Sequence, residues 1–241
     1  DTFLAIRESG FKGPVLIEKP LSVDLSYENE IDSYNTYVAY NMRFNPLLQR
    51  LREEIRGEKV ISVVGYAGQY LPLWRQESDY RRSYSSFKSE GGGVLRDYSH
   101  ELDYITWLFG DWKSVSALGG KFSSLDIDTE DSFSIIFETE NCDSVLLHLN
   151  YLSKNPKRNL IVNTTNDSFE LNFIEKSFKK NLNIELLDYD RNYSYKLQHE
   201  AILNNDLSFL CSYDNARKVL NFISKIEKST DGKSSIWINN E

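Results

Sequence analysis

The stretch Pro14-Val15-Leu16-Ile17-Glu18-Lys19-Pro20 decides the fold class of this chain. Its first five residues form a short, nearly continuous apolar run, which is typical of a strand buried on both faces. Because Pro20 follows it, Lys19 is restricted to extended backbone conformations. The sequence then predicts a capped helix over Ser22 to Tyr34 and a second buried strand over Thr36 to Tyr40. Strand, helix and strand in this order predict a parallel crossover unit.

The pattern changes after Gly57, where short strands become frequent. Before it, Asn45 and Pro46 are good first residues for a helix that Gly57 ends. After it, the predicted strands include 60–66, 131–138, 144–151, 159–164 and 168–173, with helices over 94–109 and 214–228. Their short connections favour antiparallel neighbours. We therefore expect α/β structure in residues 1–57, and in residues 58–241 an α+β domain with a mostly antiparallel sheet and helices on one face.

Composition excludes several classes of function. The 241 residues are enough for a sizeable core, and a formal net charge of −8 argues against nucleic acid or an anionic membrane as partner. The two cysteines, Cys142 and Cys211, lack metal-ligand spacing, so we expect no metal site. No apolar run approaches the roughly 20 residues of a membrane span, and no secretory signal opens the chain. A cytoplasmic location is the expectation.

The clearest candidate for chemistry is the segment Gly91-Gly92-Gly93 with the predicted helix that follows it. Asp97 and His100 lie one turn apart on this helix, about 60° from each other and opposite its apolar stripe. An acid near an imidazole favours the protonated form and can orient the ring for general base catalysis. The alternative is an acid stabilised by the helix dipole beside an exposed histidine.

Two further segments carry candidate residues. Lys19 follows a predicted parallel strand, and ligands of α/β folds bind beyond the carboxyl ends of such strands; an ordinary surface lysine is the alternative. Trp74, Tyr80 and Arg81 lie in a segment rich in aromatic and arginine side chains, which suits a polyhydroxylated or anionic ligand. A well-packed loop would explain that segment equally well.

Three ordered motifs together resemble the glucose–fructose oxidoreductase/inositol dehydrogenase/MocA family of NAD(P)-dependent oxidoreductases, which act on sugars, inositols and sugar derivatives. The motifs are Glu18-Lys19-Pro20, Val38-Ala39-Tyr40-Asn41-Met42-Arg43-Phe44, and the glycine turn that leads to Asp97, His100 and Asp103. The resemblance covers essentially the whole chain. In one respect the chain departs from the commoner family pattern, since His100 follows Asp97 by three positions instead of four.

The resemblance implies a role for each matching residue. Lys19 would lie close to the substrate hydroxyl and the nicotinamide of NAD or NADP, His100 would exchange the hydroxyl proton, and Asp97 would be its acidic companion. Glu18, Pro20, Asn41 and Arg43 would lie on the cofactor side of the same cleft, and Trp74, Tyr80 and Arg81 on the substrate side. Relatives often have this Lys-Pro bond in the cis form. Similarity around 74–84 to relatives near surface-polysaccharide pathways suggests a sugar or nucleotide-sugar substrate.

The family's dinucleotide site requires a glycine fingerprint that this sequence lacks. Only 17 residues precede Glu18, whereas one βαβ unit takes about 30 or more. We therefore expect an N-terminally truncated member, with residues 1–57 as the end of the Rossmann domain and an isolated chain that is inactive. The alternative is a non-catalytic sugar-binding or dimerisation module. As in many relatives, the antiparallel sheet would pair with further copies in a homodimer or homotetramer.

Overall fold

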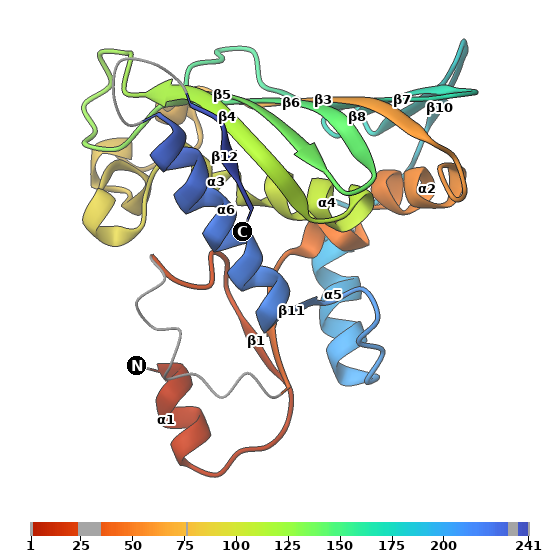
Figure 1. Ribbon diagram of the computed structural model, residues 1–241. Helices are drawn as coiled ribbons and strands as arrows, with labels where there is room; N and C mark the ends of the chain where they lie inside the picture. Colours follow the sequence, from red (N-terminus) through yellow and green to blue (C-terminus); the bar gives the residue numbers. More distant parts are fainter. Residues whose placement is uncertain (1, 24–34, 76, 231–235, 241) are drawn as a thin grey trace.

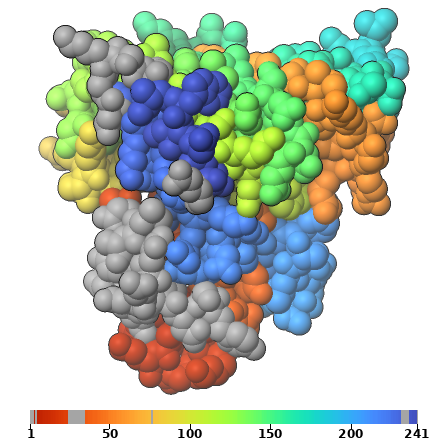
Figure 2. Space-filling view, in the orientation of Figure 1, coloured from red at the N-terminus to blue at the C-terminus, as the bar shows by residue number. Residues whose placement is uncertain are grey.

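The computed structural model describes residues 2–23, 35–75, 77–230 and 236–240. In these residues the strands form a small and a large sheet, with helices packed between and beside them (Figure 1). In the space-filling view, the N-terminal residues in red lie at the end of the molecule opposite the large sheet. Blue residues of the C-terminal part of the chain lie between the two in this view (Figure 2). The expected combination of α/β and α+β structure is confirmed.

The small sheet contains the predicted crossover strands. After α1 (Thr2–Glu8), strand β1 (Val15–Ile17) pairs in parallel with β2 (Thr36–Val38), with Ile17 opposite Val38. The short β11 (Cys211–Ser212) pairs antiparallel with β2, so this sheet takes a strand from the C-terminal part. β1 has one neighbour in the described part of the chain and is only half-buried, so the expectation of burial on both faces is wrong for it. Most of the helix predicted between the two strands lies outside the described residues.

The large sheet has the strand order β10-β9-β8-β7-β3-β6-β5-β4-β12 among the described residues. Its strands are β3 (Val60–Gly68), β4 (Trp112–Gly120), β5 (Ser132–Thr139), β6 (Cys142–Asn150), β7 (Lys157–Thr164), β8 (Ser168–Asn172), β9 (Ser177–Lys180), β10 (Asn183–Leu186) and β12 (Ile238–Asn239). The predicted antiparallel pairs β5–β6 and β7–β8 are confirmed. The exception to the antiparallel pattern is the central pair β3–β6, which is parallel.

Helices cover one face of this sheet (Figure 1). They are α2 (Pro46–Glu54), α4 (Ser99–Phe109) and α6 (Tyr213–Ser229). The predicted start of α2 is confirmed, since the Asn45 side chain accepts a hydrogen bond from the Leu47 amide and Pro46 is the first helical residue. On α6, Phe222 stacks on Trp112 of β4 with ring centroids 4.9 Å apart. The helix α5 (Tyr193–Leu203) was not expected, because its polar sequence has weak helical periodicity.

The helix predicted over residues 94–109 is interrupted. It consists of α3 (Val94–Asp97) and α4, which meet at Tyr98, whose backbone has φ −95° and ψ 24°. The last carbonyl groups of α3 are therefore free to accept hydrogen bonds from outside the helix. The interruption also changes the relative directions of the side chains on the two helices.

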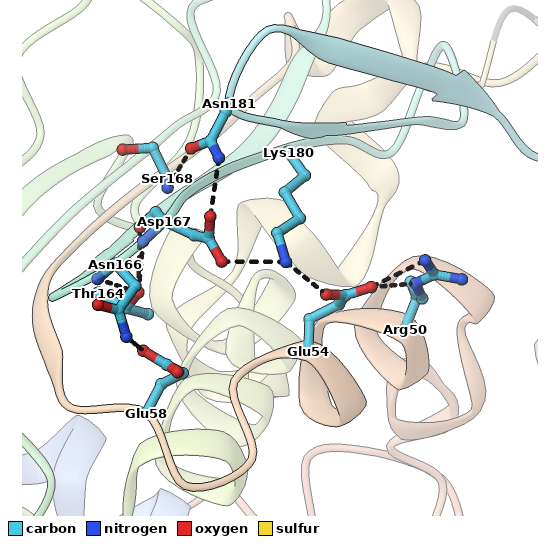
Figure 3. A network of polar contacts seen from close by, with 9 residues as sticks. All are labelled: Arg50, Glu54, Glu58, Thr164, Asn166, Asp167, Ser168, Lys180 and Asn181. Carbon is cyan, nitrogen blue, oxygen red and sulfur yellow. Dashed lines mark hydrogen bonds and ion pairs between the residues drawn. The ribbon is translucent and has the colours of Figure 1, made fainter.

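A polar network joins α2 to the strands at one end of the large sheet (Figure 3). The ammonium group of Lys180 lies 3.0 Å from a carboxylate oxygen of Glu54 and 3.0 Å from one of Asp167. Arg50 holds the other oxygen of Glu54, and Asn181 donates to Asp167. The network thereby fixes the β8–β9 hairpin against α2.

Within the described ranges, none of the helices combines the length and apolar character needed to cross a membrane.

Candidate functional site

The glycine turn, Gly91 to Gly93, precedes α3 and packs closely against the backbone of the preceding loop. Gly91 and Gly93 have φ of +76° and +113°, which favours glycine at both positions. At Gly92 a side chain would collide with the backbone, because a Cβ atom there would lie 2.2 Å from the Tyr84 carbonyl oxygen. The Gly93 amide donates to the Ser85 carbonyl oxygen at 3.2 Å. This segment therefore requires glycine for backbone geometry and close approach.

Lys19 joins the small sheet to the end of α3. Its Nζ donates to the carbonyl oxygen of Asp97 at 2.8 Å and to that of Arg96 at 3.3 Å. These carbonyls belong to the last turn of α3, next to the interruption at Tyr98. Burial lowers the pKa of Lys19, while the negative charges of Asp97 and Glu101 act in the opposite direction. The ammonium group is thus held in a partly desolvated position, where a positive charge acts strongly on its neighbours.

Asp97 is buried and bonded to a tyrosine. Its Oδ2 accepts a 2.6 Å hydrogen bond from the hydroxyl of Tyr151, which follows β6. Burial, and then the charge of Asp97, raises the pKa of Tyr84 to about 12. Both tyrosines therefore keep their protons at neutral pH, and Tyr151 is a hydrogen-bond donor to the carboxylate.

His100 differs from the expectation of an acid–histidine pair. Its ring packs edge-on against Tyr40 with centroids 5.5 Å apart, and its Nδ1 is buried without a hydrogen-bond partner in the described part of the chain. Burial lowers its pKa well below the usual value, and the positive charges of Lys19 and Arg158 lower it further. The expected stabilisation of the protonated ring by Asp97 is therefore wrong. The helix wheel failed because it assumed one continuous helix through Tyr98.

A cleft of about 540 Å³ opens beside His100. Its wall includes Asn41, Tyr98, Arg158, Phe173 and Tyr189, together with His100 itself. Of the His100 ring nitrogens, Nδ1 is the buried one, so Nε2 is the nitrogen available to a molecule in the cleft. A neutral imidazole with one accessible nitrogen can accept a proton.

Two charged residues of this region were not found from the sequence. Glu101 of α4 is 1% exposed, and its Oε1 accepts a 2.6 Å hydrogen bond from Nε of Arg158 on β7. The arginine lines the cleft, whereas the second carboxylate oxygen of Glu101 is buried without a partner in the described residues. Glu101 lies one position after His100, but nothing in the sequence pattern indicates that β7 supplies its partner. One signal could have indicated Glu101: in the helix predicted over residues 94–109 it lies near the apolar face, and a buried glutamate needs a partner.

Arg43 has its charge satisfied inside the protein. Its guanidinium holds both carboxylate oxygens of Asp103, with a closest distance of 2.7 Å, and both side chains are buried. Although burial opposes it, the negative charge of Asp103 raises the pKa of Arg43, which stays positive at every accessible pH. Asn41, by contrast, lines the His100 cleft.

Glu18 and Pro20 lie on either side of Lys19, after the carboxyl end of β1. Glu18 is exposed and Pro20 is half-buried. The Lys19-Pro20 bond is cis, as the resemblance implied.

Trp74, Tyr80 and Arg81 do not line the His100 cleft. Trp74 packs edge-on against Tyr98 and Tyr151 and donates to the Gln69 carbonyl. It therefore contacts the site only through Tyr98, which lines the cleft, and Tyr151, which binds Asp97. The Tyr80 hydroxyl accepts from the Asp126 amide. Arg81 forms an exposed ion pair with Asp79, two positions before it. No cluster of side chains suited to a metal ion occurs among the described residues.

The family model for the GFO/IDH/MocA C-terminal domain matches residues 48–170. Levoglucosan dehydrogenase in complex with NADH shares the fold, with a TM-score of 0.80 at 17% identity over 98% of this chain and 75% of that chain. An inositol dehydrogenase homolog with NAD⁺ from Azotobacter vinelandii gives a TM-score of 0.78 at 14% identity, over 99% of this chain and 74% of that chain. No curated protein matches the sequence.

The two sheets define an α/β class of protein that shares its fold with these two dehydrogenases. Within that class, the chain belongs to the GFO/IDH/MocA family.

Proposed function

We propose that this chain belongs to an NAD(P)-dependent oxidoreductase that oxidises a hydroxyl group of a sugar or sugar derivative. The observation that carries the proposal is a neutral His100 at an open cleft, with the charge of Lys19 acting on its ring, although Lys19 is not among the residues that line this cleft. Lys19 is fixed by the Arg96 and Asp97 carbonyls, and its positive charge is close enough to help lower the pKa of the imidazole.

The proposed proton chemistry uses the accessible face of His100. Nε2 accepts the proton of the substrate hydroxyl, which the low pKa of the ring permits because the ring is unprotonated at neutral pH. Lys19 stabilises the negative charge that develops on the substrate oxygen. Asp97 acts on the position of Lys19 through its own backbone, since its carboxylate is bonded to Tyr151. Asp97 is therefore a positioning residue in this proposal.

The residues present fit a nicotinamide at the edge of the small sheet. β1 and β2 run parallel and in register, so Glu18, Lys19 and Pro20 after β1 and Asn41 after β2 lie at the same sheet edge. These residues would hold the nicotinamide end of NAD or NADP, which supplies the hydride acceptor. We propose that residues 1–57 form the cofactor side and residues 58–241 the substrate side. Arg43 would support the cofactor side through its buried pair with Asp103.

A sugar-type substrate agrees with the wall of the cleft. Tyr98, Phe173, Tyr189 and Tyr195 line it, and aromatic rings with polar edges suit the mixed apolar and polar surface of a sugar ring. A solved structure of levoglucosan dehydrogenase contains NADH and levoglucosan and shares the fold, with a TM-score of 0.81 at 16% identity. In this proposal Trp74, Tyr80 and Arg81 shape the surroundings of the cleft without touching the substrate.

A separate observation, an exposed apolar row on the large sheet, supports a second function, the association of the chain with further copies of itself. Val64 of β3 lies opposite Ile161 of β7 on one side and Leu146 of β6 on the other, and Leu146 lies opposite Ile136 of β5. All four side chains are exposed, whereas their strand neighbours, such as Val63, Val145 and Val162, are buried. Because side chains alternate between the two faces of a sheet and the helices cover one face (Figure 1), the four exposed side chains belong to the other face. An apolar row across four strands is typical of an interface. We propose that this face pairs with a second copy.

The enzyme proposal is tested with the protein that contains these residues. NADH or NADPH formation is followed by absorbance with a panel of sugars, sugar acids and inositols as substrates. Reduction of either cofactor with at least one of them supports the proposal. Binding of these sugars without any turnover would favour the non-catalytic alternative.

A further inference from the structure

The His100 cleft is lined by an unbalanced set of charges. Lys157, Arg158, Lys176 and Arg191 are among its lining residues, and no acidic residue of the described chain is. This contrasts with the formal net charge of −8 for the whole sequence. The four cations come from β7, from the turn between β8 and β9, and from the loop before α5, so the fold gathers them from separate segments. Elsewhere the average field of the protein repels anions, but here it attracts them.

Of these four cations, Lys176 is held in place without being neutralised, and Arg158 is paired with Glu101. Nζ of Lys176 donates to the Tyr189 carbonyl oxygen at 2.6 Å and lies 5.1 Å from the centroid of the Tyr189 ring. A carbonyl group and an aromatic ring position the ammonium but do not cancel its charge. Neither Lys157 nor Arg191 has an ion pair with another residue in the described ranges. Glu101 compensates the charge of Arg158, so about three positive charges of the cleft stay uncompensated, those of Lys157, Lys176 and Arg191.

Arg158 adds a directed group. Its Nε is used by Glu101, but its two Nη nitrogens have no hydrogen-bond partner among the described residues and are not buried. The edge of a guanidinium that carries free N–H groups can bind a carboxylate or a phosphate through two parallel hydrogen bonds. Glu101 fixes the plane of this guanidinium on the cleft wall.

We propose that the substrate of this cleft carries an anionic group, a carboxylate or a phosphate, which binds at Arg158, Lys176 and Arg191. This inference rests on the proposed function and narrows its substrate class from sugars in general to acidic or phosphorylated sugars. The hydroxyl to be oxidised lies at His100, and the anionic group binds toward the wall formed by β7 and the loop before α5.

The experiment measures the binding of three matched probes to the protein by calorimetry at low and constant salt. The probes are glucose, glucuronate and glucose 6-phosphate, which share a ring and differ in charge. We expect at least one acidic probe to bind at least about tenfold more tightly than glucose, with the preference falling as salt is added. Whichever acidic probe binds better identifies the carboxylate or the phosphate as the preferred group.

The variant Lys176→Gln/Arg191→Gln removes two of the charges. It should lose about tenfold or more in affinity for the acidic probe and leave the affinity for glucose unchanged. Lys12→Gln/Lys59→Gln is the matched control, since both lysines are exposed and do not line the cleft. If the double variant unfolds, as judged by circular dichroism, Arg191→Gln alone serves in its place, because Arg191 makes no contact on which the loop depends.

Four results would overturn the inference. If glucose and the acidic probes bind equally, the anion site fails while the sugar cleft of the proposed function stands. If the control variant loses as much affinity as the cleft variant, the effect belongs to the overall charge. If NADH affinity falls in the cleft variant while the affinity for the acidic probe does not, the cations serve the cofactor. Absence of binding by all three sugars would contradict the inference and the proposed sugar cleft together.

Discussion

The ammonium group of Lys19 lies 2.8 Å from the carbonyl oxygen of Asp97, and this hydrogen bond joins segments 78 positions apart in the sequence. It brings the end of the parallel strand β1 to the interrupted helix that carries His100. The positive charge of Lys19 and the neutral imidazole are therefore parts of one site. This relationship has consequences that can be measured.

Removal of the Lys19 charge should raise the pKa of His100. Burial is the main cause of its low pKa and Lys19 is the second, so Lys19→Met should move the imidazole titration upward. Lys19→Arg keeps the charge and should move it much less. The measurement is a titration of the imidazole NMR signal of His100 in the parent protein and in both variants. An unchanged His100 midpoint in Lys19→Met would show that the two groups are not coupled.

The titration of His100 should also make the free energy of unfolding depend on pH. Since the pKa of His100 is lower in the folded protein than in the unfolded chain, the unfolded chain binds more protons just below the ordinary histidine value of about 6.5. The contribution of His100 to stability is therefore complete above that pH and is lost as the pH falls toward the folded value.

The buried pair of Arg43 and Asp103 should be sensitive to the loss of one partner. Asp103→Asn leaves the Arg43 charge buried without its carboxylate, and we expect a loss of about 3–5 kcal/mol in the free energy of unfolding. Replacement of both by apolar residues, Arg43→Met/Asp103→Leu, should recover a large part of that loss. Urea denaturation of the three proteins measures the difference. A single variant as stable as the parent would mean that the pair is open to water.

The network around Lys180 should show its effect only above the carboxylate pKa values. Hydrogen bonds from Lys180 are the first cause of the lowered pKa of both Glu54 and Asp167. For a carboxyl group with a lowered folded pKa, the stabilisation is present above the unfolded value and fades as the pH falls through the folded one. Lys180→Met should therefore lower the melting temperature at pH 7 and lower it much less at pH 3.

Lys179→Met is the matched control for that comparison, because Lys179 is the neighbouring lysine and its carboxylate partner Glu170 is 3.7 Å away. A melting temperature that falls equally in both variants, or equally at both pH values, would exclude the network as the cause.

A charged side chain in the apolar row on the helix-free face of the large sheet should dissociate the proposed assembly of two copies of the chain. Leu146 is exposed at the centre of the apolar row, so Leu146→Asp should convert an oligomer into a folded monomer. Leu203→Asp introduces the same change at an exposed position at the end of α5, away from the sheet, and should leave the assembly intact. Light scattering coupled to size-exclusion chromatography measures the mass. An assembly that survives Leu146→Asp would place the interface elsewhere.

The sequence allowed the main elements of the fold to be predicted because their signals are local. Apolar runs marked β1, β2 and most strands of the large sheet, and Asn45 with Pro46 marked the start of α2. The interruption at Tyr98 could not be predicted, since no glycine or proline marks it and the ring that packs against Tyr98, that of Trp74, lies far away in the sequence. For the same reason the direction of Asp97 toward Tyr151, and not toward His100, was beyond the reach of a helix wheel.

The roles proposed for the candidate residues remain predictions, but their placement can be compared with the sequence. Lys19 is bonded to the Asp97 carbonyl and its charge acts on His100, and His100 and Asn41 line one cleft, whereas the Asp97 carboxylate is bonded to Tyr151 and not to His100. The ion pair of Glu101 and Arg158 could not be predicted, because it joins α4 to β7 across 57 positions of the sequence. Arg81 was a candidate for its charge, but the structure pairs it with Asp79 at the surface.

The central claim is that His100 accepts the substrate proton, and the His100→Ala variant tests it most directly. In the protein that contains this chain, turnover should fall at least about 100-fold, while the dissociation constant of NAD(P)H changes by less than about threefold. This result would show that the imidazole acts in the chemical step and not in cofactor binding. Turnover within about twofold of the parent enzyme would contradict the account and remove His100 from the proposed role.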